Sequence, residues 1–133
     1  KKIKRVANTG HYLYKGDSTK KYNKMCKDVG NNVCITSGVR SIVKQMSLYF
    51  DKIIKFNGNI SKASNSIAPP AYSYHALGDF DIGKKGLGSD NFTTKFTKTK
   101  VFKKIKKLSY IDMRYTIDNK DGVRYEPWHV KIV

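Results

Sequence analysis

The chain has 133 residues and a formal net charge of +17, and a length in this range fits one domain with a core of its own. No apolar run approaches the roughly 20 residues of a membrane-spanning helix, so the sequence excludes a membrane span. Its basic residues are 23 Lys and only 4 Arg. Specific nucleic-acid recognition relies on the bidentate contacts of Arg, so this balance disfavours a specific nucleic-acid partner and indicates a generally basic surface.

The first half of the chain predicts an arm, two helices and a strand. Residues 1–16 are expected to form an irregular arm with a short strand at 12–14, and Asp17 or Ser18 can cap a helix that runs to about residue 28. A short buried strand is expected at 33–36. The longest helix follows, and its apolar residues recur at steps of three and four: Val39, Ile42, Val43, Met46, Phe50, Ile53 and Ile54. We expect this helix to be the core helix.

The second half predicts mainly strands. Residues 59–71 are poor in apolar side chains and predict a loop, and a strand follows around Phe80. Residues 91–109 predict a second helix, with its apolar side facing inward: Phe92, Phe96, Val101, Phe102, Ile105 and Leu108. The last two segments, 111–116 and 123–133, predict a hairpin. This order of elements indicates an α+β domain over residues 1–133, an antiparallel sheet with helices packed on one side.

Two segments carry the residue types of a catalytic zinc site. His75 and Asp81 fall in the stretch 72–83, while Glu126, the only Glu of the chain, lies three residues before His129. In catalytic zinc sites three protein ligands hold the metal, water fills the fourth position, and a nearby carboxylate accepts the proton of that water. A lone His usually has a structural role, but the combination of two His with Asp and Glu favours a metal.

Strand geometry leaves two aspartates open as the carboxylate ligand. Asp79 and Asp81 flank Phe80, and the alternation of a strand places both carboxylates on the face opposite Phe80. The same alternation would point Glu126 and His129 to opposite faces. We therefore expect a bend or bulge at Pro127, which would let both side chains reach one metal.

These residues resemble the motifs of the VanY-type D-alanyl-D-alanine carboxypeptidases, zinc peptidases related to lysostaphin-like enzymes and the hedgehog N-terminal domain. Four segments carry the resemblance: Ser37-Gly38-Val39-Arg40 followed by Gln45, Ser73-Tyr74-His75-Ala76-Leu77-Gly78, Asp81-Ile82, and Glu126-Pro127-Trp128-His129. The segment from His75 to Asp81 spans six residues where the family pattern has seven. We choose Asp81 over Asp79 as the ligand because an apolar residue follows it.

The resemblance implies a role for each residue of these motifs. His75, Asp81 and His129 would bind Zn²⁺, Glu126 would be the general base, and Arg40 would contact the substrate or the developing oxyanion. Four further residues are predicted to contact substrate: Ser73, Gln45, Tyr74 and Trp128. For Ser73, Tyr74 and Trp128, a packing role is the alternative interpretation. The implied fold is that of the hedgehog and D-Ala-D-Ala peptidase domains.

The implied substrate is a peptidoglycan stem peptide. A D,D-carboxypeptidase that releases terminal D-alanine is the leading interpretation, and L,D-specific or endopeptidase cleavage stays open. A basic cell-wall or polyanion-binding domain that keeps the metal site without catalysis is the alternative. The substrate implies export to the periplasm or cell envelope by a targeting segment outside this chain. The protein is expected to be a monomer, and its basic surface is expected to attract anionic wall polymers. In that compartment Cys26 and Cys34 could form a disulfide, and two free thiols are the alternative.

Overall fold

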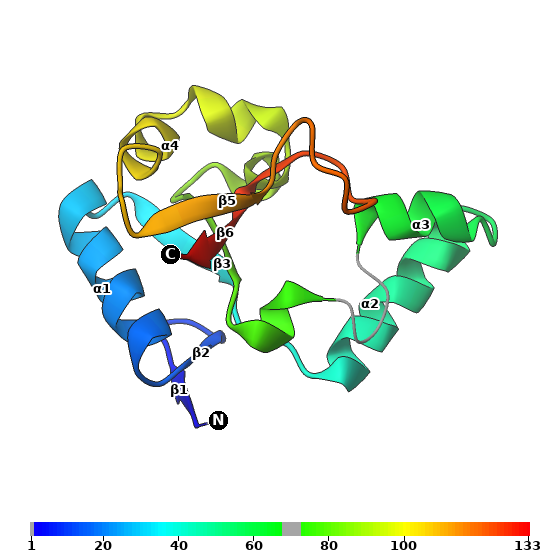
Figure 1. Ribbon diagram of the computed structural model, residues 1–133, viewed down its shortest axis with the longest axis horizontal. Coiled ribbons are helices and arrows are strands. Elements are labelled where there is room, and N and C mark those ends of the chain that lie inside the picture. The colour runs from blue at the N-terminus through cyan, green and yellow to red at the C-terminus, as the bar shows by residue number, and fades with distance from the viewer. Residues whose placement is uncertain (1, 68–72) are drawn as a thin grey trace.

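The computed structural model describes residues 2–67 and 73–133 and shows an α+β domain built on a four-stranded antiparallel sheet (Figure 1). The strands lie in the order β3 (Val33–Ser37), β4 (Phe80–Lys84), β6 (Glu126–Ile132) and β5 (Ile111–Tyr115). A separate two-stranded ribbon pairs β1 (Ile3–Arg5) with β2 (Tyr12–Tyr14). The predicted fold class is confirmed, and the predicted arm is this ribbon.

One face of the sheet packs against helices and forms the core. Phe80 and Ile82 of β4 and Val130 of β6 are fully buried there. The helices over this face are α1 (Asp17–Val29), η3 (Thr94–Lys98) and α4 (Lys100–Ile105), and the core also includes Met25, Phe96 and Phe102 from them. Alternation along β4 therefore turns Asp81 to the opposite face, away from the core.

A bulge in β6 changes the direction of its first residues. Met113 of β5 pairs with Val130 of β6, and Tyr115 pairs with Glu126, so three residues of β6 lie opposite one residue of β5. The expected irregularity at Pro127 is found there. Because the extra residues break the strict alternation, Glu126 and His129 can both face the polar side of the sheet.

The longest helix is not the core helix that its apolar pattern predicted. α2 (Ile42–Lys55) lies with α3 (Ile60–Ser66) to one side of the sheet, on the right in Figure 1. Val43 and Ile54 are 77% and 75% exposed, and Met46 and Phe50 are exposed as well. The side of α2 that is buried contains Gln45 and Tyr49. A helical period shows that a helix is amphipathic, and it does not show whether another element covers the apolar side.

Two further predictions about secondary structure are wrong, both because side-chain caps act locally. Asn59 accepts a hydrogen bond from the amide of Lys62 and starts α3 inside the predicted loop, whose last residues lie outside the described ones. In the predicted helix 91–109, Thr93 and Thr99 each cap a new helix, so the segment divides into η2 (Gly88–Phe92), η3 and α4. Phe92, expected inward, is exposed.

The two cysteines are free thiols, both half-buried. The disulfide considered from the sequence is therefore absent from the structure. Among the described helices, none has the length and apolar character needed to cross a membrane.

Candidate metal centre

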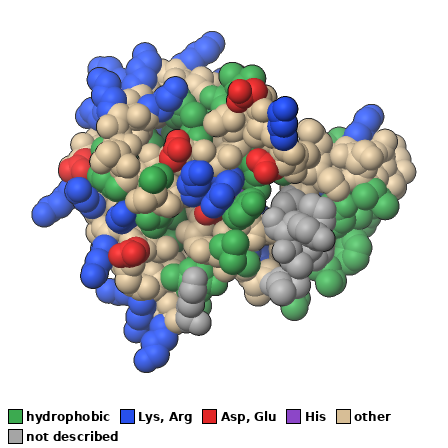
Figure 2. All heavy atoms as spheres, in the orientation of Figure 1, with side chains coloured by type: hydrophobic (Ala, Val, Ile, Leu, Met, Phe, Trp, Pro, Cys, Tyr) green, Lys and Arg blue, Asp and Glu red, His purple; other side chains and the backbone are tan. Residues whose placement is uncertain are grey.

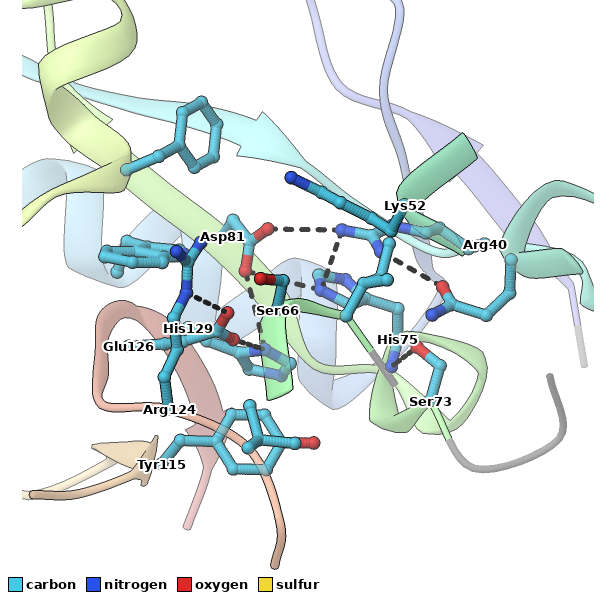
Figure 3. A pocket seen from close by; sticks show the side chains of 15 residues that line it. Arg40, Lys52, Ser66, Ser73, His75, Asp81, Tyr115, Arg124, Glu126 and His129 are labelled. Carbon is cyan, nitrogen blue, oxygen red and sulfur yellow. Dashed lines mark hydrogen bonds and ion pairs between the residues drawn. The ribbon is translucent and has the colours of Figure 1, made fainter. Parts of the chain in front are cut away.

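Three buried side chains from three elements meet on the polar face of the sheet (Figure 3). His75 comes from η1 (Tyr74–Leu77), Asp81 from β4 and His129 from β6. Asp81 and His129 are directly paired across β4 and β6, so the sheet register itself brings them together. One ligand atom from each of the three lies within 4.8 Å of the others.

The hydrogen bonds on the outer side of the two imidazoles turn one nitrogen of each toward the cluster. His75 Nδ1 lies 3.0 Å from the carbonyl oxygen of Gly38, to which it can only donate, so Nε2 carries the lone pair. His129 Nε2 lies 2.9 Å from Asp79 Oδ2, which leaves Nδ1 with the lone pair. These two nitrogens lie 3.3 and 3.7 Å from Asp81 Oδ1.

Asp81 Oδ1 is the third donor atom that faces the cluster. It is a buried oxygen with no hydrogen-bond partner among the described residues, although a buried unsatisfied carboxylate oxygen is costly. Two imidazole lone pairs and this oxygen form the N and O donor set that Zn²⁺ accepts, with the fourth position left for water or substrate. The residues present therefore fit a catalytic zinc ion.

Charge interactions in the cluster favour the ionised carboxylate. Burial would raise the pKa of Asp81, but His75, His129 and Arg40 together lower it below its ordinary value. Burial likewise opposes the charged form of His129, yet its hydrogen bonds to Asp79 and Glu126 raise its pKa to about 9. The carboxylates thus make this cluster attractive to a positive charge.

Glu126 lies beside the three ligands. Its Oε1 is 3.5 Å from His129 Nδ1, and its Oε2 is 3.8 Å from Arg124 Nε. The residue is buried but lines a cavity of about 310 Å³ that also reaches His75, Asp81 and His129. A carboxylate in this position can exchange a proton with a molecule held in the cavity.

Arg40 lies on the side of the ligands away from Glu126 (Figure 3). It directly precedes Ser41, the N-cap residue of α2, and so lies outside the helix. Its guanidinium donates to Asp81 Oδ2 at 3.3 Å and lies 3.1 Å from His75 Nε2. Ser37 Oγ and Gln45 Oε1 accept from the same guanidinium at 3.1 and 3.0 Å. Arg40 is thus a fixed positive charge at the edge of the cavity.

Of the four residues predicted to contact substrate, three line the cavity and one does not. Ser73, Gln45 and Trp128 line the cavity. Ser73 also accepts a hydrogen bond from the amide of His75 and so caps η1, while Gln45 holds Arg40. Tyr74 is absent from the cavity lining, and its ring lies under the guanidinium of Arg114 at 3.8 Å.

The prediction from sequence did not identify several residues of the site. Tyr115 contacts the His129 ring edge-on at 4.8 Å, and Lys52 and Arg124 add positive charge to the cavity lining. No local pattern marks these residues. Asp79 was considered only as a ligand, although its strand position could have suggested a partner for His129.

An α+β domain with three such ligands and a carboxylate beside them defines a metal-dependent hydrolase. The profile of the VanY D-alanyl-D-alanine carboxypeptidase family matches residues 14–133, so the chain belongs to this family. The predicted family and the predicted class of enzyme, a metallopeptidase, are confirmed. A search of curated proteins found no match.

Solved structures share the fold over almost the whole chain. VanYB in complex with D-alanine-D-alanine is 22% identical with a TM-score of 0.77, and the match covers 99% of this chain and 77% of that one. A vancomycin resistance D,D-pentapeptidase VanY in complex with Zn(II) is 22% identical with a TM-score of 0.75, covering 99% and 78%. The LD-carboxypeptidase LdcB is 25% identical with a TM-score of 0.74, covering 98% and 62%. The zinc prediction agrees with both the donor set here and the Zn(II) complex of this fold.

Proposed function

We propose that this protein is a zinc-dependent D,D-carboxypeptidase that removes the terminal D-alanine of peptidoglycan stem peptides. The observation that carries the proposal is the buried group of His75, Asp81 and His129, with an unpartnered carboxylate oxygen facing two imidazole lone pairs. The family to which the chain belongs is described by this activity. The VanY relative solved with Zn(II) supports zinc as the metal.

The zinc ion would be held by His75 Nε2, His129 Nδ1 and Asp81. When bound, it would act as a Lewis acid that polarises the scissile carbonyl and lowers the pKa of water. Glu126 accepts the proton of the attacking water because its carboxylate faces the same cavity as the ligands. The same carboxylate then returns the proton to the leaving amine. Arg40 stabilises the developing oxyanion through a guanidinium that Ser37 and Gln45 already hold in place.

The charges that line the cavity suit a peptide with a free carboxyl end. Besides Arg40, Lys52 and Arg124 reach the cavity, and these two side chains can bind a terminal carboxylate beside the metal ligands. Relatives of this fold include both a VanY bound to D-alanine-D-alanine and an LD-carboxypeptidase. We favour D,D cleavage because the family description names it, and L,D cleavage is the second candidate.

The first experiment measures metal content and turnover together. We expect the purified protein to bind one zinc ion per chain and to release D-alanine from a stem pentapeptide in preference to the corresponding tetrapeptide. Glu126→Gln should keep the zinc and the fold but lose activity by about a hundredfold or more, since general base catalysis contributes about 10²–10⁴. Wild-type protein without zinc and without turnover would reject the proposal, and faster cleavage of the tetrapeptide would reassign it to L,D cleavage.

We also propose that the protein acts at the cell envelope, where its substrate lies. Figure 2 shows Lys and Arg side chains gathered over the region of α1 and α4, on the left and top of the view. With a net charge of +17, this surface would attract anionic wall polymers in a salt-dependent way. Binding to purified wall should weaken steeply as salt rises, and should not change when zinc is removed.

A further inference from the structure

One buried ion pair beside the ligands has no part in the mechanism so far. Asp79 accepts two hydrogen bonds from Arg114 of β5, from Nε to Oδ2 at 2.8 Å and from Nη2 to Oδ1 at 3.0 Å. The Asp79 side chain is almost fully buried. Two parallel hydrogen bonds from one guanidinium are the geometry in which an ionised carboxylate accepts, so Asp79 places a negative charge beside His129.

Both oxygens of Asp79 are therefore engaged before any metal is considered. Oδ1 accepts from Arg114, and Oδ2 accepts from both Arg114 and His129 Nε2, the latter at 2.9 Å. Asp79 is also absent from the ligand group formed by His75, Asp81 and His129. The two aspartates that the sequence left as alternatives thus have different partners.

The ion pair is itself held by neighbouring elements. The Arg114 guanidinium lies over the Tyr74 ring at 3.8 Å, and the amide of Asp79 donates to the carbonyl of Tyr74 at 3.1 Å. Gly78 adopts a left-handed φ of +114°, which favours glycine, and ends η1, so that Asp79 lies directly before β4. Contacts from η1 and β5 therefore fix the carboxylate that contacts His129.

We propose that Asp79, locked by Arg114, is the positioning residue that prepares His129 as a metal ligand. A neutral imidazole carries one proton, and a buried carboxylate that accepts from Nε2 keeps that proton on the side away from the metal. The Nδ1 lone pair then points to the cluster, and the negative charge increases its basicity. The inference rests on the proposed zinc site. It adds Asp79 and Arg114 to that site, and neither residue belongs to the four motif segments that resemble the family.

The test measures zinc affinity, by competition with a chelator, and the tautomer of His129, by ¹⁵N NMR of the imidazole in zinc-free protein at a pH high enough for the ring to be neutral. Asp79→Ala should weaken zinc binding by about 10–100-fold, the usual effect of losing an outer hydrogen bond to a ligand. It should also remove the preference for the proton on Nε2. Asp79→Asn should bind zinc more tightly than Asp79→Ala but more weakly than the wild type, because its amide oxygen can accept from His129 Nε2 but carries no negative charge and cannot accept both bonds from Arg114. Asp51→Ala, an exposed aspartate on α2, is the matched control and should bind zinc as the wild type does.

Arg114→Lys provides a second variant, since it keeps the charge and loses the two-point contact. It should weaken zinc binding less than Asp79→Ala and more than Asp51→Ala. If Asp79→Ala does not fold, Asp79→Asn and Arg114→Lys decide the question by the same two measurements. Zinc affinity within twofold of the wild type in every folded variant, with the His129 tautomer unchanged, overturns the inference and leaves the proposed function standing. A wild-type protein that binds no zinc overturns both.

Discussion

Replacing Gln45 by methionine tests whether a buried amide makes Arg40 effective. Gln45 is only 2% exposed, and its Oε1 accepts a hydrogen bond from Arg40 Nη1 at 3.0 Å. Methionine has a similar length and volume but cannot accept that bond, so the change removes the interaction with little change in packing. A hydrogen bond to a charged group contributes about 1.5–3 kcal/mol.

The structure sets the expected size of the effect on turnover. If the whole contribution were lost from the transition state, kcat/KM would fall by about 10–150-fold, since about 1.4 kcal/mol corresponds to a factor of ten. Arg40 keeps its contacts with Ser37 and Asp81, which limit its movement. We therefore expect a decrease of about tenfold to thirtyfold for Gln45→Met.

The assay is the release of D-alanine from a stem pentapeptide, with zinc content and thermal unfolding measured on the same samples. Zinc content should not change, because Gln45 contacts Arg40 and is not part of the ligand group. Gln45→Glu keeps an acceptor for Arg40 and should retain more activity than Gln45→Met. Wild-type kcat/KM in Gln45→Met, with a lower unfolding temperature alone, would refute the reasoning and give Gln45 a purely structural role.

Three further outcomes are expected. Asp81→Ala should reduce zinc affinity by at least about a hundredfold, measured by chelator competition, because it removes one of three protein ligands. In chelator-treated protein, the raised pKa of His129 stabilises the fold below pH 6.5 by an amount on the order of 3 kcal/mol. This contribution should be lost as the pH rises to about 9. Urea unfolding that shows rising stability over this pH range would contradict the prediction. Phe50→Ser should change the free energy of unfolding by no more than about 0.5 kcal/mol, because Phe50 is 53% exposed. Phe80→Ala should lower the free energy of unfolding by about 3–5 kcal/mol, because Phe80 is fully buried. Equal losses in the two variants would show that α2 is a core helix after all.

Local patterns were sufficient for the parts of the fold that depend on near neighbours in the chain. The alternation around Phe80 correctly separated the core side of β4 from its polar side, and the motif at Glu126 required the bulge that β6 contains. The choice of Asp81 over Asp79 came from a family resemblance, and the geometry gives the two carboxylates different partners. The ligand group and the class of enzyme could therefore be predicted because the motifs that carry these residues resemble those of a known family.

The errors concern features that depend on distant parts of the chain. The apolar period of α2 was real, but nothing in 14 consecutive residues tells whether another element covers Val43 or Ile54. The split of residues 91–109 shows the opposite effect, since the hydroxyls of Thr93 and Thr99 capped new helices where the apolar pattern favoured one.

The sequence by itself determined the α+β class through the order of its predicted elements, the residue types of the metal site through the pairing of two His with Asp and Glu, and the family through the resemblance of its motifs. Only the tertiary structure decided how the site is held. The proton position on His129 depends on Asp79, and Asp79 depends on Arg114, which is 35 residues away in the chain. Hydrogen bonds act over about 3 Å in space, and only the folded chain brings such residues within that distance.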